Sequence, residues 1–126
     1  MDEKFRTQLE ENGADVKTTI NRFMGKEELY LKFIFKFPED KNMSSLLESF
    51  EKKDYEGVFN SAHSLKGVTG NLGLNPVYEA TARICDLLRG KKPEEVDEEK
   101  LYELKEQLTK TYNCFQQLIE NYKESQ

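Results

Sequence analysis

Apolar residues recur at intervals of three and four positions along most of the chain, the spacing that places side chains on one face of an α-helix. The repeat is clearest in the middle of the sequence, where it comprises Val58, Ala62, Leu65, Thr69 and Leu72. Asp54 can cap the start of this helix, and Gly73 can end it. A helix between these two residues is therefore predicted.

Two further helices follow in the second half of the chain. Asn75 as N-cap and Pro76 at the first helical position predict the start of one, and Gly90 predicts its end. Its apolar side carries Val77, Ala80, Ile84 and Leu87. After the polar connection KKPEEVD, the last helix repeats at Leu101, Leu104, Leu108, Thr111, Phe115, Leu118 and Tyr122. This alternation of three and four is typical of antiparallel helices that pack near 20°.

The beginning of the chain carries shorter helical signals. Phe5 and Leu9 predict a short, frayed helix within residues 1–12. Asp15 is a plausible N-cap for a further helical turn that closes near Gly25. The apolar residues of that turn are Val16, Ile20 and Phe23.

The run EELYLKFIFKF at residues 27–37 is open to two interpretations. Its aromatic and β-branched residues and their partial alternation are compatible with a strand. Its acidic start and the helical character of the rest of the chain favour a helix that is buried on most sides. Pro38 then ends this helix or opens the next one, over residues 39–52. That next helix carries Met43, Leu46, Leu47 and Phe50.

These elements together predict an all-α fold. We expect an up-and-down antiparallel four-helix bundle, with its core at about residues 39–124, and additional N-terminal helices in residues 1–37. The length of 126 residues fits one domain, so residues 1–126 are expected to form a single unit. The chain has no internal repeat or low-complexity tract.

Charge and hydropathy exclude several classes of function. The chain has 19 Lys and Arg against 24 Asp and Glu, a net charge of −5, which argues against nucleic-acid binding. No stretch approaches the roughly 18 apolar residues of a membrane span. The first residues, MDEKFRTQLEEN, lack the basic-then-apolar order of a signal peptide. We therefore expect a cytoplasmic protein that works as a monomer, away from nucleic acid and membranes.

The chain has two cysteines, Cys85 and Cys114, and one histidine. A disulfide framework normally needs more cysteines in a smaller secreted domain. No CxxC pair exists, and a single histidine cannot build a His-rich zinc or iron site. No metal site is therefore predicted, and both thiols are expected to be buried packing residues.

The segment SAHSLKGVTGNLGL at residues 61–74 differs from the rest of the chain, because it holds the only histidine and three of the seven glycines. On a helix, His63 shares a face with Lys66 and Gly67 ahead of it and with Phe59 and Asn60 behind it. It lies about 100° round from the apolar stripe position before it, so it should be at or near the surface. Phe59 also falls off the stripe. It is expected to be partly exposed and, with Asn60 and Gly70, to form a surface for a partner, the alternative being that its ring is half-buried against the neighbouring helix.

The two glycines inside this helix need a reason, because each costs about 0.8–1 kcal/mol relative to alanine. Gly70 could mark a helix that loosens towards its end, but the apolar repeat continues well past Gly67. The functional interpretation is that bare backbone lets a large partner approach His63. Lys66 could neutralise a phosphoryl group on the imidazole, and a neutral imidazole that attacks phosphorus forms a phosphoramidate.

The stretch AHSLKGVTGNLGL resembles the signature of histidine-containing phosphotransfer (HPt) domains of two-component relays: alanine, the phosphorylated histidine, a hydrophobic residue, Lys-Gly, small residues, then Leu/Ile-Gly. Residues 13–37 also resemble the helix that precedes the bundle in that family. The resemblance implies that His63 takes a phosphoryl group on Nε2 from the aspartate of one receiver domain, or from a hybrid kinase, and passes it to another receiver. It implies no cofactor on this chain, since the receiver supplies Mg²⁺ and the aspartate.

The sequence departs from the family at one position. Several members carry a glutamine 22 positions after the histidine that hydrogen-bonds near the imidazole; here that position is Cys85, a poor substitute. Arg89, one turn further on, could supply a second positive charge there. The chain lacks a phosphate loop GxxxxGK[ST] and the ATP-binding boxes of a histidine kinase, so no autonomous kinase activity is expected. The alternative function is a helical adaptor that docks receiver or kinase domains without being phosphorylated.

Overall fold

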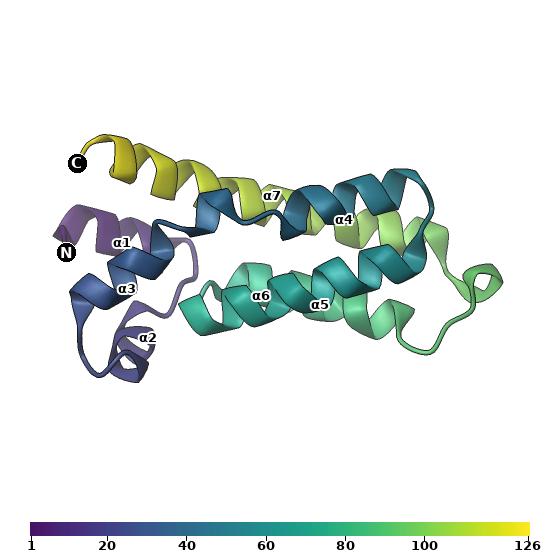
Figure 1. Ribbon diagram of the computed structural model, residues 1–126, viewed down its shortest axis with the longest axis horizontal. Coiled ribbons are helices and arrows are strands. Elements are labelled where there is room, and N and C mark those ends of the chain that lie inside the picture. Colours follow the sequence, from purple (N-terminus) through teal and green to yellow (C-terminus); the bar gives the residue numbers. More distant parts are fainter.

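The computed structural model describes residues 1–126, and every regular element in it is helical (Figure 1). In chain order the elements are α1 (Glu3–Glu11), α2 (Val16–Arg22), α3 (Glu27–Ile34), the 3₁₀-helix η1 (Phe37–Glu39), α4 (Asn42–Glu51), α5 (Tyr55–Leu72), α6 (Asn75–Leu88), the 3₁₀-helix η2 (Pro93–Glu95) and α7 (Glu98–Glu124). The all-α class is confirmed, and the strand alternative for residues 27–37 is excluded.

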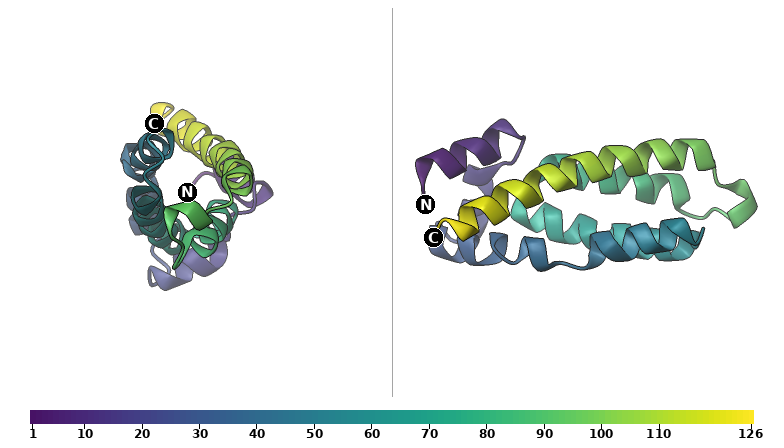
Figure 2. Two further views of the ribbon diagram at one scale, coloured as in Figure 1. Left: turned by 90° about the vertical axis from the view of Figure 1, so that its right-hand side faces the viewer. Right: turned by 90° about the horizontal axis from the view of Figure 1, so that it is seen from above.

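Helices α4 to α7 form an up-and-down bundle, in which each helix runs antiparallel to the one before it (Figure 2). Helix α5 packs between α4 and α6, and α6 packs against α7. Side chains close the remaining side between α4 and α7: the Lys105 ammonium lies 4.9 Å from the centroid of the Phe50 ring, and Lys53 pairs with Glu98 at 3.4 Å. The predicted four-helix bundle is therefore confirmed.

Capping residues set the ends of the site helix, α5. An Asp54 side-chain oxygen accepts a hydrogen bond from the Gly57 N–H at 3.0 Å, and Gly73 ends the helix with a left-handed φ of +71°. Both features were predicted. The start of α6 was placed one residue too late, because the N-cap is Leu74 and not Asn75. The Leu74 side chain is fully buried and its carbonyl accepts from the Tyr78 N–H at 3.0 Å, so core packing decides where this helix begins.

The buried face of α5 consists of the five residues predicted for it: Val58, Ala62, Leu65, Thr69 and Leu72. The face predicted for α7 is right in its first half and at Phe115, and wrong at Thr111, Leu118 and Tyr122, which are only half-buried. The buried residues of α7 are Leu101, Leu104, Leu108, Tyr112, Phe115 and Ile119. A helix turns once in 3.6 residues, so over 27 residues its buried face drifts away from a strict alternation of three and four.

The buried face of α6 is wider than its spacing predicts. Val77, Ala80 and Ile84 are buried as expected, but Leu87 is only half-buried. Thr81, Cys85 and Leu88 complete the buried set. The helix contacts both α5 and α7, and a helix with two neighbours buries a broader stripe.

The segment 27–37 forms a helix through Ile34, and Pro38 lies in the short η1 that follows. The expectation that this helix is buried on most sides is wrong. Tyr30 and Ile34 are buried, whereas Phe33 is 41% exposed, because α3 lies at the edge of the bundle and packs through one face only. Residues 13–37 also form two helices and not one, since the turn at Met24 and Gly25 has left-handed φ angles of +58° and +74°.

The N-terminal helices close the end of the bundle where α5 meets α6 (Figure 1). The Phe5 ring stacks on Tyr122 of α7, with centroids 3.9 Å apart. The Asp15 N–H donates to the Gly73 carbonyl at 2.9 Å, and Arg22 Nη2 donates to the Gly70 carbonyl at 3.1 Å. These bonds attach the last turn of α5 to the N-terminal helices.

Cys85 is buried as expected, but Cys114 is exposed. It lies one position before buried Phe115, on the outer side of α7, where its thiol donates to the Asn12 side-chain oxygen at 3.0 Å. No three histidine, cysteine, aspartate or glutamate side chains gather in a way that could hold a metal ion. None of the helices combines the length and apolar character that crossing a membrane requires.

Candidate functional site

His63 lies on the outward face of α5, near the middle of the helix, and its side chain is exposed. The buried residues Ala62 and Leu65 on either side of it in sequence face the core. Because this stripe fixes the rotation of the helix, the imidazole has to point away from the bundle. The surface position predicted for His63 is therefore confirmed.

Phe59 is half-buried, and its ring lies parallel to the His63 imidazole, with an interplanar angle of 8° and centroids 6.1 Å apart. The guanidinium carbon of Arg89, at the end of α6, lies 5.8 Å from the centroid of the same ring. Arg89 also donates from Nη1 to an Asp86 carboxylate oxygen at 2.7 Å. Phe59 thus connects the imidazole to a cation of the next helix.

Lys66 provides the other cation near His63. Its side chain is half-buried, and its ammonium nitrogen lies 5.7 Å from the centroid of the Tyr78 ring. None of the salt bridges in the structure involves Lys66. Its charge is therefore not compensated by a carboxylate, in contrast to that of Arg89.

The two helical glycines have different surroundings. A Cβ atom at Gly67 would meet nothing within 4 Å, so the backbone there is open to an approaching molecule. A Cβ atom at Gly70 would lie 3.1 Å from Cδ2 of Tyr78, which is tighter than an ordinary contact. Gly67 fits the predicted access for a partner, and Gly70 has a packing reason of its own. Asn60 is exposed one turn before His63.

Cys85 is fully buried under the surface between α5 and α6. Burial raises the pKa of its thiol, while the nearby charges of Lys66 and Arg89 act in the opposite direction. The thiol itself does not reach that surface, so the structure does not bring Cys85 next to a group bound on His63.

Sequence reasoning missed Tyr78, which is 38% exposed in the first turn of α6 and contacts both Lys66 and Gly70. The available signal was an aromatic residue just off the apolar stripe, on the helix that follows the histidine helix. Its contact with α5 could not be predicted, because it depends on the relative rotation of two helices.

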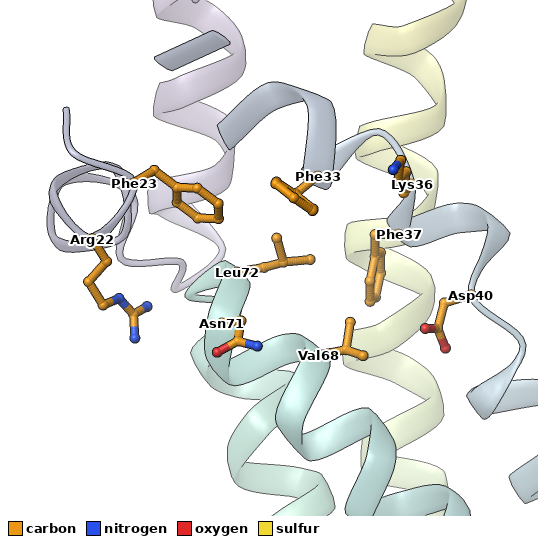
Figure 3. A pocket seen from close by; sticks show the side chains of 9 residues that line it. All are labelled: Arg22, Phe23, Phe33, Lys36, Phe37, Asp40, Val68, Asn71 and Leu72. Atoms are coloured by element: carbon orange, nitrogen blue, oxygen red, sulfur yellow. The ribbon is translucent and has the colours of Figure 1, made fainter. Parts of the chain in front are cut away.

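A groove lies on the other flank of α5, between its C-terminal half and the N-terminal elements (Figure 3). Its volume is about 460 Å³. The apolar lining residues are Phe23, Phe33, Phe37, Val68 and Leu72, and the polar ones are Arg22, Lys36, Asp40 and Asn71. Figure 3 shows the apolar side chains pointing towards one another around the hollow, with the charged groups at its edges.

Comparison with known protein families gave one finding. The family model described as the Hpt domain matches residues 28–114. The matched range contains α4, α5 and α6 and all the candidate site residues. No curated protein and no solved structure matched the chain.

Proposed function

The chain belongs to the Hpt domain family, and we propose that it carries phosphoryl groups on His63 between receiver domains of a phosphorelay. Hpt domains are histidine phosphocarriers of two-component systems and act together with receiver domains. The specific proposal is that His63 accepts a phosphoryl group from the phospho-aspartate of one receiver, or from a hybrid kinase, and passes it to the receiver of a response regulator.

The observation that carries this proposal is the isolated, open position of His63. It is the only histidine of the chain, it is exposed on the outward face of α5, and the space above Gly67, one turn away, is empty. The aspartate of a receiver is part of a folded domain, so a whole domain must be able to approach the histidine. A Cβ at position 67 would stand in that path.

The transfer step needs a nucleophile and a positive charge. Nε2 of the neutral imidazole attacks phosphorus, the N–P bond forms, and the P–O bond to the aspartate breaks, releasing the carboxylate; the imidazole proton stays on Nδ1. Transfer of a phosphoryl group depends mainly on alignment and charge stabilisation. Lys66 supplies an uncompensated ammonium for the phosphoryl oxygens, and Arg89 adds a second, carboxylate-paired cation. The reverse step loads the next receiver.

In this scheme the chain needs no cofactor of its own, because the receiver supplies both Mg²⁺ and the aspartate. The chain has no kinase activity and works as a cytoplasmic monomer that meets one receiver at a time. These points are expectations.

We propose that the docked receiver covers α5 from Phe59 and Asn60 to Asn71, and with it the groove of Figure 3. A standard interface buries about 800 Å² on each partner, which corresponds to a disc about 16 Å in radius. Asn71 lies about 12 Å along the helix from His63 at about 1.5 Å per residue. A footprint of this radius centred on His63 extends along α5 as far as the groove, and Phe33, an exposed aromatic residue, is the contact that we expect there.

The test is incubation of the protein with a panel of phosphorylated receivers. We expect transfer of label to the parental protein, in a product that is labile to acid and stable to alkali, and no label on His63→Gln. Ser64→Ala, at the next exposed position, is the matched control and should be labelled. Label on His63→Gln would refute the proposal. Stable binding of phosphorylated receivers without any transfer would instead support the adaptor function.

A further inference from the structure

The Tyr78 ring lies where Lys66 and Gly70 meet the first turn of α6. Its Cδ2 and Cε2 atoms would be 3.1 and 3.2 Å from a Cβ at Gly70, so the ring occupies the space that a side chain would need. The Lys66 ammonium lies 5.7 Å from the centroid of the same ring. We propose that Tyr78 is a positioning residue, which holds the Lys66 ammonium on the α5–α6 surface next to His63. This inference rests on the proposed function.

Lys66 needs such a support because nothing else in the structure restrains its charge. It has no salt bridge, and a lysine side chain is a point charge on a flexible four-carbon stem. The face of an aromatic ring attracts an ammonium within about 6 Å of its centroid. The ring therefore limits the directions that Lys66 samples before a phosphoryl group arrives.

The ring itself is held on both of the helices that it joins. The Tyr78 N–H donates to the carbonyl of fully buried Leu74, which fixes the first turn of α6 against the core. On the α5 side, the Gly70 carbonyl accepts from Arg22 of the N-terminal helices. The Tyr78 ring lies against Gly70, between two helical turns that are each fixed by hydrogen bonds. Its position next to Lys66 is therefore well defined.

Arg89 shows the same arrangement on the other side of His63, with the Phe59 ring as its platform. The difference is that Arg89 is paired with Asp86 at 2.7 Å. Lys66 is therefore the cation whose full charge is available to a phosphoryl group. The Tyr78 ring sets the position of this ammonium before the phosphoryl group binds.

The central test is a double-mutant cycle between Tyr78→Leu and Lys66→Ala, read as the rate of transfer from a phosphorylated receiver. We expect Tyr78→Leu to slow transfer about two- to five-fold, or about 0.5–1 kcal/mol at 1.36 kcal/mol per tenfold, which is the range of an exposed cation–π contact. In the Lys66→Ala background the same change should have no further effect. Tyr78→Phe keeps the ring and should transfer at the parental rate.

Tyr102→Leu is the matched control, because the Lys105 ammonium lies 4.8 Å from the Tyr102 ring centroid on α7, away from the site helix. It should transfer normally. A second readout does not depend on transfer: the Lys66 ε-methylene protons should be shifted upfield by the ring in the parental protein and in Tyr78→Phe, and not in Tyr78→Leu. Absence of transfer to the parental protein, with this shift present, would therefore count against the proposed function and not against the contact.

Gly70→Ala provides a second route if Tyr78→Leu unfolds. The added Cβ displaces the ring without removing it, so the methylene shift should shrink and transfer should slow, again only when Lys66 is present. The positioning role is refuted if the ring can be removed or displaced without a change in rate, or if the slowing is equally large in the Lys66→Ala background.

Discussion

Replacement of Gly67 by alanine or leucine should change stability and transfer in opposite directions: the protein should become more stable, and phosphoryl transfer should become slower. A Cβ at this position meets nothing within 4 Å, so an alanine side chain does not disturb the fold and a leucine side chain starts from an open position. Alanine should raise the free energy of unfolding by about 0.8–1 kcal/mol, because a helical glycine is replaced by a better helix former. For a domain of this size, that gain corresponds to a rise of about 3–5 °C in Tm.

Transfer should fall in the same variants. The added side chain stands one turn from His63 on the exposed face, where the receiver backbone has to approach, and a misplacement of about 1 Å can slow a reaction ~100-fold. Leucine should therefore slow transfer more than alanine. The measurement is a melting curve beside a transfer time course, with Asn113→Ala, an exposed helical position on α7, as a control that gains helix propensity without touching the site. Parental transfer by Gly67→Leu would show that nothing docks closely over this face.

Three other changes test the site, the groove and the core. Lys66→Ala should change the free energy of unfolding by at most about 0.5 kcal/mol and slow transfer about tenfold or more, because it removes the uncompensated charge; an unchanged rate with an intact helical spectrum would refute its role. Phe33→Ser should weaken receiver binding in a titration of the folded variant, and equal weakening by Tyr102→Ser on α7 would contradict a specific groove contact. Burial raises the pKa of Tyr112 to about 12, so its phenol stays protonated in the folded protein at a pH where the unfolded chain releases the proton. Between pH 10 and 12 the free energy of unfolding should therefore fall by about 1.4 kcal/mol per pH unit for this group, and Tyr112→Phe should remove that share of the slope in urea titrations.

The helices of the bundle were predictable because each one buries a single stripe and has a recognisable start. Asp54 and the repeat from Val58 to Leu72 placed α5 correctly, cap included. The second half of α7 was not predictable from a seven-residue repeat, because its buried face follows the true helical turn through Tyr112 and Ile119. The expected burial of Cys114 is wrong, because the apolar character of a residue does not determine whether it lies on the buried or the exposed side of a helix.

The candidate site was predictable to the extent that it lies on one helix. The relation of His63 to Lys66, Gly67 and Phe59 follows from helical spacing alone. Contacts that cross to α6 depend on how two helices are rotated against each other, which a single sequence does not state. For this reason the ring of Tyr78 over Lys66 was missed, and Gly70 was interpreted without the packing that explains it.

The stability of α5 shows how a helix can carry two glycines at its functional face. In intrinsic helix propensity, Gly67 and Gly70 together cost close to 2 kcal/mol relative to alanine. The Asp54 cap at one end is worth about 1 kcal/mol, and the exposed hydrogen bond from Arg22 to the Gly70 carbonyl at the other end contributes about another 1 kcal/mol. Contacts at the two ends thus offset the weakness in the middle, so the backbone beside His63 can remain open without loss of the helix that positions it.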